Sequence, residues 1–151
     1  MESEEKNTNK VLWLKIAAGI CFSMAAIQTF ISLSPAAAAY FQAPPSLLDD
    51  RLRLFIIGGV AALIPVIFGL YALSGAGIIK HLPLLRTVLT GISSIFLLRG
   101  LFLFITVLKI GGILKGEIQV QGVITHFAFL TAGIVFAAGT KLNWEEMKIK
   151  K

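Results

Sequence analysis

The sequence predicts an all-α integral membrane protein, a four-helix bundle made of four transmembrane helices with antiparallel neighbours. Hydrophobic residues make up 56% of the 151 residues and charged residues only 15%, a composition far from that of soluble domains. The apolar residues also occur in long blocks rather than at the spaced positions of amphipathic helices. No segment alternates between apolar and polar residues as the strands of a transmembrane barrel do.

The apolar blocks have the length that a membrane-crossing helix requires. We expect spans at about residues 11–33, 54–75, 87–108 and 118–140, because about 20 apolar residues cross the hydrocarbon layer. Unpaired backbone groups are excluded from lipid, so these blocks must be helices. The other segments are too short to fold alone. Residues 1–151 are therefore expected to form a single membrane domain, with an external loop at 34–53.

The first block also resembles the core of a cleavable secretory signal, because small residues follow it at 35–39. It is longer than the 7–15 residues usual for such a core. The leader before it is acidic, with Glu2, Glu4 and Glu5. We therefore expect an intact first span.

The basic residues favour one orientation across the membrane. An even number of spans places both termini and the loop before residue 87 on one side. That side would carry Lys6, Lys10, Lys15, Lys80, Arg86, Lys141, Lys148, Lys150 and Lys151. The other side would carry Arg51, Arg53, Lys109 and Lys115. Because cytoplasmic loops are enriched in Lys and Arg, we expect both termini in the cytoplasm, with the chain in a plasma or bacterial inner membrane.

The connections between the spans contain recognisable local signals. Prolines at 35, 44 and 45 exclude one continuous helix through the external loop, although residues 36–41 could form a short helical turn. The segment Asp49-Asp50-Arg51-Leu52-Arg53 is compatible with a metal or ligand site, but it is more typical of the polar start of a helix. Residues 74–77, Ser-Gly-Ala-Gly, predict the end of the second span.

Small residues recur at helical spacing in three of the expected spans, a pattern that permits close helix association in membranes. They are Ala17, Cys21 and Ala25 in the first span, Gly58, Ala62 and Gly69 in the second, and Gly122, Gly133 and Ala137 in the fourth. The third span instead surrounds its arginine with bulky residues. Cys21 is the only cysteine, so an intramolecular disulfide and a thiolate metal cluster are excluded.

Arg99 is the residue whose position demands a chemical explanation, because it lies near the middle of the third span. An arginine at the centre of a membrane helix costs about 2.5–3.5 kcal/mol on insertion scales. No acidic residue lies within any expected span. The candidates to compensate its charge are His126, the Ala61 carbonyl freed by Pro65, Gln28, Ser32 and, by outward reach, Asp49, Asp50 or Glu117.

Two functional hypotheses follow. In the first, the chain is a non-enzymatic structural or accessory protein that binds itself or a larger membrane partner through its small-residue faces. In the second, Arg99, His126 and Gln28 form an intramembrane pocket that binds or transports a small anionic or lipid-like ligand. Catalytic motifs are missing from the sequence, so we expect no catalytic residues, metal or cofactor. The net charge of +6 is spread over the ends of the apolar blocks, which favours contact with lipid headgroups over nucleic acid.

Overall fold

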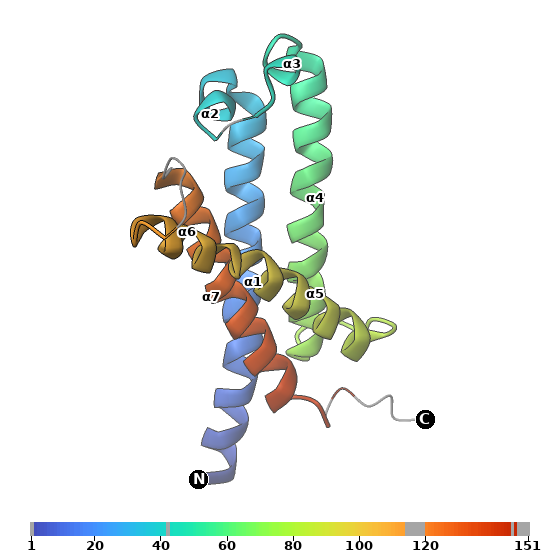
Figure 1. Ribbon diagram of the computed structural model, residues 1–151. Coiled ribbons are helices and arrows are strands. Elements are labelled where there is room, and N and C mark those ends of the chain that lie inside the picture. Colours follow the sequence, from blue (N-terminus) through green and yellow to red (C-terminus); the bar gives the residue numbers. More distant parts are fainter. Residues whose placement is uncertain (1, 42, 114–119, 146, 148–151) are drawn as a thin grey trace.

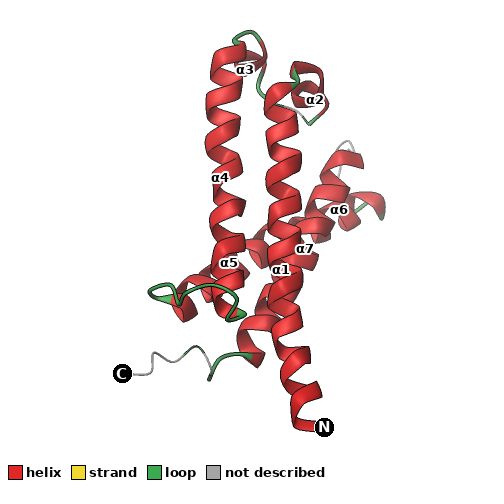
Figure 2. Cartoon of the chain, turned by 180° about the vertical axis from the view of Figure 1, so that it is seen from behind, coloured by secondary structure: helices red, strands yellow, loops and turns green. Residues whose placement is uncertain are grey.

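The computed structural model describes residues 2–41, 43–113, 120–145 and 147, with the side chains of 2–10 left aside. Within these residues the chain is helical, without strands. The helices are α1 (Glu2–Leu33), α2 (Pro35–Tyr40), α3 (Pro45–Leu48), α4 (Arg51–Gly75), α5 (Leu85–Gly100), α6 (Phe102–Ile110) and α7 (Val120–Leu142). Figure 1 shows their arrangement and Figure 2 shows it from behind.

The all-α class is confirmed, and the chain is a multi-pass integral membrane protein. Among the described residues, four segments are long and apolar enough to cross a membrane: Val11–Leu33, Arg51–Gly75, Leu85–Ile110 and Val120–Leu142. The polar leader does not precede the first helix but belongs to it, since α1 begins at Glu2. Glu and Lys favour helices, so the helix continues beyond the apolar block in the direction of the N-terminus.

Helix α4 ends where the local sequence predicts. After α4 the chain turns at Gly77, whose φ is +71°, and the Ile78 N–H donates to the Leu73 carbonyl at 3.0 Å. This is a Schellman ending, in which glycine adopts the left-handed conformation and the last carbonyls of the helix stay paired. Gly112, with φ of +74°, ends α6 in the same way. In the external loop the prolines begin two short helices, α2 and α3.

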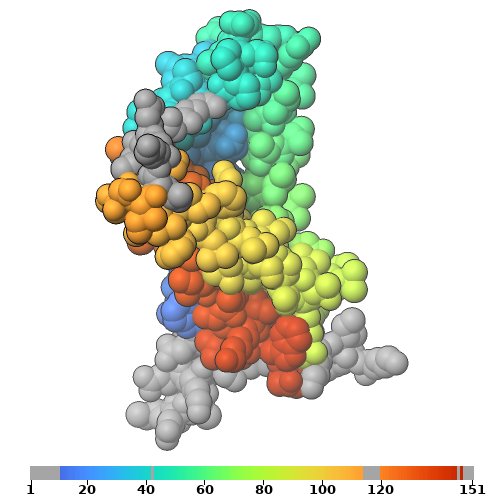
Figure 3. Space-filling model, viewed as in Figure 1, coloured from blue at the N-terminus to red at the C-terminus, as the bar shows by residue number. Residues whose placement is uncertain are grey.

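The helices pack as two pairs. Helix α1 lies beside α4 along much of its length, and α5 packs against α7. Helix α7 also contacts α1, whereas α4 touches α5 much less. Figures 1 and 2 show α5 and α6 running obliquely to α1 and α4, and Figure 3 shows them lying across the front of the molecule. The start of α1 and the end of α7 lie at the same end of the molecule.

Small residues hold the first pair together. A Cβ placed on Gly58 of α4 would lie 2.0 Å from Ser32 Oγ, and one on Gly69 would lie 3.0 Å from the ring of Phe22. On the facing side of α1, Cys21 and Ala25 are buried. The small-residue faces of α1 and α4 therefore serve contacts within the chain.

The second pair crosses at two glycines. A Cβ on Gly100 of α5 would lie 2.6 Å from the Cα atom of Leu130, and one on Gly133 of α7 would lie 2.8 Å from the backbone nitrogen of Leu97. The two backbones are thus in contact, because each helix has a glycine at the point where the other helix crosses it. Directly after this crossing the third span is interrupted at Leu101, where we had expected one continuous helix. There the Phe104 N–H bonds to the Leu101 carbonyl, three residues back, at 2.9 Å.

An aromatic cluster connects the two pairs. Phe96 of α5 is 4% exposed, and its ring centroid lies 5.6 Å from that of Phe68 on α4 and 5.6 Å from that of Phe136 on α7. Edge-to-face pairs at such distances add to the stability gained by burial. The cluster lies on the buried face of α5. It therefore fixes which side of α5 packs against α4 and α7.

The start of α5 is anchored to both of its neighbours. Ser74 Oγ of α4 donates to the Lys80 carbonyl at 3.1 Å and accepts from the Leu82 N–H at 2.9 Å, so it holds the loop that leads into α5. The Arg86 guanidinium lies 4.7 Å from the ring of Trp144 and donates to the Trp144 carbonyl. These contacts fasten α5 to the segment that follows α7.

The close contact at Gly100 can be tested by substituting Gly100 and, for comparison, another glycine of α5. We predict that Gly100→Ala lowers the free energy of unfolding by about 1–3 kcal/mol, because the new methyl group meets the backbone of Leu130. Gly91 has no atom within 4 Å of a built Cβ, so Gly91→Ala should be neutral or stabilising. Denaturant titration of the detergent-solubilised protein measures both. Equal effects of the two substitutions would contradict the close crossing.

Candidate functional site

Arg99 lies in the last turn of α5, next to the Gly100 crossing, and its side chain is exposed. The residues of α5 that turn inward are Leu89, Ile92, Ser93 and Phe96. Arg99 lies at the edge of this inward face, three residues after Phe96, and it is exposed together with Ile95 and Leu98. The cation therefore faces outward from the helix pairs and is not enclosed between them.

The faces of two aromatic rings flank the guanidinium. Its central carbon lies 5.8 Å from the ring centroid of Phe102 on α6 and 5.7 Å from that of Phe129 on α7. Both distances are within the range of cation–π attraction, which partly offsets the loss of water around the charge. The rings leave the N–H groups of the guanidinium available, because they are contacted through their faces and do not accept conventional hydrogen bonds.

His126 lies beside one of these two rings. Its imidazole stacks on Phe102, with 5.9 Å between the ring centroids and 21° between the planes. No hydrogen bond joins His126 to Arg99 among the residues that the structure describes. His126 Nδ1 is buried and has no described partner. Phe102 thus links the two polar groups.

The other groups expected to compensate Arg99 are used elsewhere or lie apart from it. Ser32 is buried against Gly58 and donates to the Gln28 carbonyl at 2.7 Å. Gln28 itself is half-buried on α1, which packs on α4 and α7. Helix α4 continues through Pro65. Within the described part of the chain, Arg99 donates no side-chain hydrogen bond to Gln28 or to the Ala61 carbonyl.

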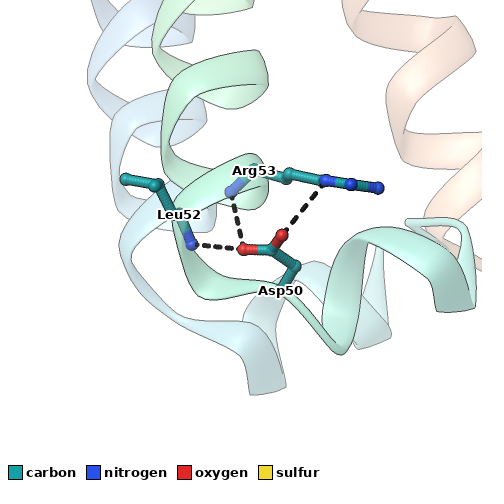
Figure 4. Close-up of polar contacts among 3 residues, drawn as sticks. All are labelled: Asp50, Leu52 and Arg53. Atoms are coloured by element: carbon teal, nitrogen blue, oxygen red, sulfur yellow. Dashed lines mark hydrogen bonds and ion pairs between the residues drawn. The ribbon is translucent and has the colours of Figure 1, made fainter.

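The acids of the external loop serve the start of α4. Asp50 accepts hydrogen bonds from the backbone N–H groups of Leu52 at 3.0 Å and Arg53 at 3.1 Å, and its second oxygen lies 3.1 Å from Arg53 Nε (Figure 4). This arrangement confirms the interpretation of the Asp-Asp-Arg-x-Arg segment as the polar start of a helix. Glu117, another candidate partner of Arg99, lies outside the described residues.

Metal chemistry has no support in this region. No group of three or more His, Cys, Asp or Glu side chains that could hold a metal ion occurs among the described residues. Cys21 is fully buried between helices and acts as a small packing residue. What the site offers is an exposed cation between two aromatic rings.

The sequence analysis did not predict that Phe129 contacts Arg99 or that Arg99 is exposed. The spacing of Phe129 three residues after His126 puts both on one side of α7, so their association could have been inferred. The direction of Arg99 could not, because it depends on how α5 is rotated at its crossing with α7.

Substitution of each arginine of α5, Arg99 and Arg86, tests which of the two side chains is held by contacts within the chain. We predict that Arg99→Leu leaves the free energy of unfolding unchanged or raises it, because the side chain has no described hydrogen bond to lose. Arg86→Leu should lower it by about 1–3 kcal/mol, since Arg86 loses its bond and its ring contact with Trp144. Unfolding of both variants in the same detergent gives the comparison. A loss at Arg99 as large as that at Arg86 would show that Arg99 is satisfied within the chain.

Comparison of the chain with protein-family models, with curated proteins and with solved structures finds no match. No family role can therefore be carried over to Arg99 or to its neighbours.

Proposed function

We propose that the chain is a non-enzymatic membrane protein that binds an anionic, lipid-like molecule at Arg99. The observation that carries the proposal is the exposure of Arg99 on an apolar span, flanked by Phe102 and Phe129. A cation in this environment is stabilised by an anion from outside the chain, because no acid in the described spans is paired with it. A guanidinium also binds carboxylates and phosphates through two parallel hydrogen bonds.

The surroundings of Arg99 suit an amphiphile better than a free inorganic ion. Ile95 and Leu98 on the same side of α5 are exposed, at 56% and 62%, and offer apolar surface to an acyl chain. Carboxylate and phosphate head groups share this chemistry, so both a fatty acid and a phosphate lipid fit the site.

The small-residue faces weigh against the accessory role in its original form. Gly58, Gly69 and Gly133 of these faces make close contacts within the chain, whereas a Cβ on Gly122 of α7 would meet no atom within 4 Å. An accessory role would instead use Arg99 as the docking point for an acidic residue in the span of a partner, or of a second copy. The exposed position of Arg99 supports this second candidate as well.

We further propose that both termini are cytoplasmic and that the chain belongs to a plasma or bacterial inner membrane. The start of α1, the end of α7 and the α4–α5 loop share one end of the molecule. In the sequence, most of the lysines that flank the apolar blocks belong to this end. The enrichment of basic residues on the cytoplasmic side of membrane proteins supports the assignment.

Binding of defined amphiphiles tests the proposed function. Oleate, oleoyl lysophosphatidate and the neutral oleyl alcohol are added to the detergent-purified protein, and retained adducts are counted by native mass spectrometry. We expect both anions to be retained over the alcohol, and Arg99→Leu to weaken their retention by about tenfold or more, as for a hydrogen bond to a charged group. The preferred anion identifies the head group.

Arg51→Leu is the matched control, because it removes one arginine at the exposed start of α4. It should retain the anions as the wild type does. Equal retention of oleate and oleyl alcohol by every variant would refute binding at Arg99. A dimer without adducts that Arg99→Leu dissociates would favour the accessory role.

A further inference from the structure

The depth of Arg99 restricts the kind of anion that it can hold. Arg99 lies near the middle of the span Leu85–Ile110. Phe129, whose ring flanks it, lies well inside the span Val120–Leu142. An anion paired with the guanidinium is therefore within the hydrocarbon layer, below the level of the lipid headgroups. Water is scarce at this depth, so each polar atom of the anion needs a partner from the protein.

The side chains that adjoin Arg99 are apolar. Phe102 and Phe129 present their ring faces to the guanidinium. Ile95 lies one helical turn before Arg99 on the same side of α5, and Leu98 lies next to it; both are exposed. These four side chains offer no hydrogen bond to an anion.

The polar side chains nearest to Arg99 are bonded or turned elsewhere. Ser94 and Thr106, the hydroxyls that precede and follow it in the third span, donate their protons to carbonyls of their own helices at 2.9 and 3.2 Å. The imidazole of His126 lies against the ring of Phe102, and its Nδ1 atom is buried. The guanidinium is therefore the one charged donor that the described residues offer to an anion at this depth.

A carboxylate matches a single guanidinium better than a phosphate does. Its two oxygens pair with two parallel N–H groups, and its one negative charge equals the positive charge of Arg99. A phosphate monoester has three terminal oxygens and a charge of about −1.5 to −2, so one oxygen and part of the charge stay unpaired. The glycerol of a phospholipid adds further polar atoms. Each buried polar group without a partner lowers the affinity by about tenfold.

We propose that Arg99 selects a long-chain monocarboxylic acid, held as its carboxylate, over lipids that carry a phosphate. The inference rests on the proposed function, since it names the head group of the anion at Arg99. The acyl chain lies along the exposed side of α5, at Leu98, Ile95 and Gly91. A Cβ built on Gly91 meets no atom within 4 Å, so the acyl chain can approach the helix backbone there.

Competition between two amphiphiles with the same oleoyl chain tests the proposal. The protein in phosphatidylcholine nanodiscs is mixed with equal amounts of oleate and oleoyl lysophosphatidate, and the retained adducts are counted by native mass spectrometry. The ratio of the two adducts is compared with that of Arg99→Leu, which corrects for their different partitioning into the lipid. We expect the wild type to favour oleate by about tenfold or more relative to this variant.

The other outcomes separate this inference from the proposed function. Lysophosphatidate retained as well as oleate or better, with both weakened by Arg99→Leu, would overturn the inference and leave the proposed function standing. Retention of both anions that is unaffected by Arg99→Leu would overturn the two together.

A donor added beside Arg99 gives a second test. Ile95→Gln places an amide N–H group one turn away, where it can bond an oxygen that the guanidinium leaves unpaired. We expect this variant to retain lysophosphatidate several-fold more than the wild type does, with oleate unchanged. Ile57→Gln is the matched control and should alter neither. Ile57 is exposed to a similar degree, 50% against 56%, and precedes Phe68, where α4 meets α5, by about three turns. Unchanged retention of lysophosphatidate in Ile95→Gln would show that unpaired oxygens do not limit binding, contrary to the proposal.

Discussion

The close crossing of α5 and α7 is the constraint on which the rest of the structure depends. Lipid removes most of the hydrophobic advantage of bringing apolar helices together, so association depends on close packing. Gly100 and Gly133 allow the two backbones to touch. A side chain at either position would force the helices apart. The crossing also fixes the rotation of α5 about its axis, because Gly100 and Phe96 must both face inward.

That rotation determines where the polar groups of the third span lie. With Phe96 turned toward α4 and α7, Arg99 faces outward between two aromatic rings. Between the start of α5 and this crossing, the hydroxyls of Thr90, Ser93 and Ser94 donate their protons to backbone carbonyls, and Thr90 and Ser94 are exposed. One packing contact thus exposes a cation and acceptor hydroxyls on the same helix.

Much of the fold could be predicted from the sequence because its determinants are local. The length of an apolar block sets the length of a span, glycine at 77 ends α4, and Asp50 caps the start of that helix. The candidate site could be predicted only in part. Depth along a helix follows from residue number, so Arg99 and His126 were expected at a similar depth, and in the structure both lie beside the ring of Phe102. The direction of Arg99 and the oblique path of α5 depend on contacts between distant segments, for which hydropathy carries no signal.

The outward direction of Arg99 is the central claim, and spin-label accessibility along α5 measures it most directly. Single cysteines are introduced at positions 87–100 of a Cys21→Ser protein in liposomes, and the collision rate of each attached label with oxygen is recorded. The structure predicts a helical period, with high rates at 91, 95, 98 and 99 and low rates at 89, 92, 93, 96 and 100. A low rate at position 99, in phase with position 96, would place the arginine inside the protein and contradict the account.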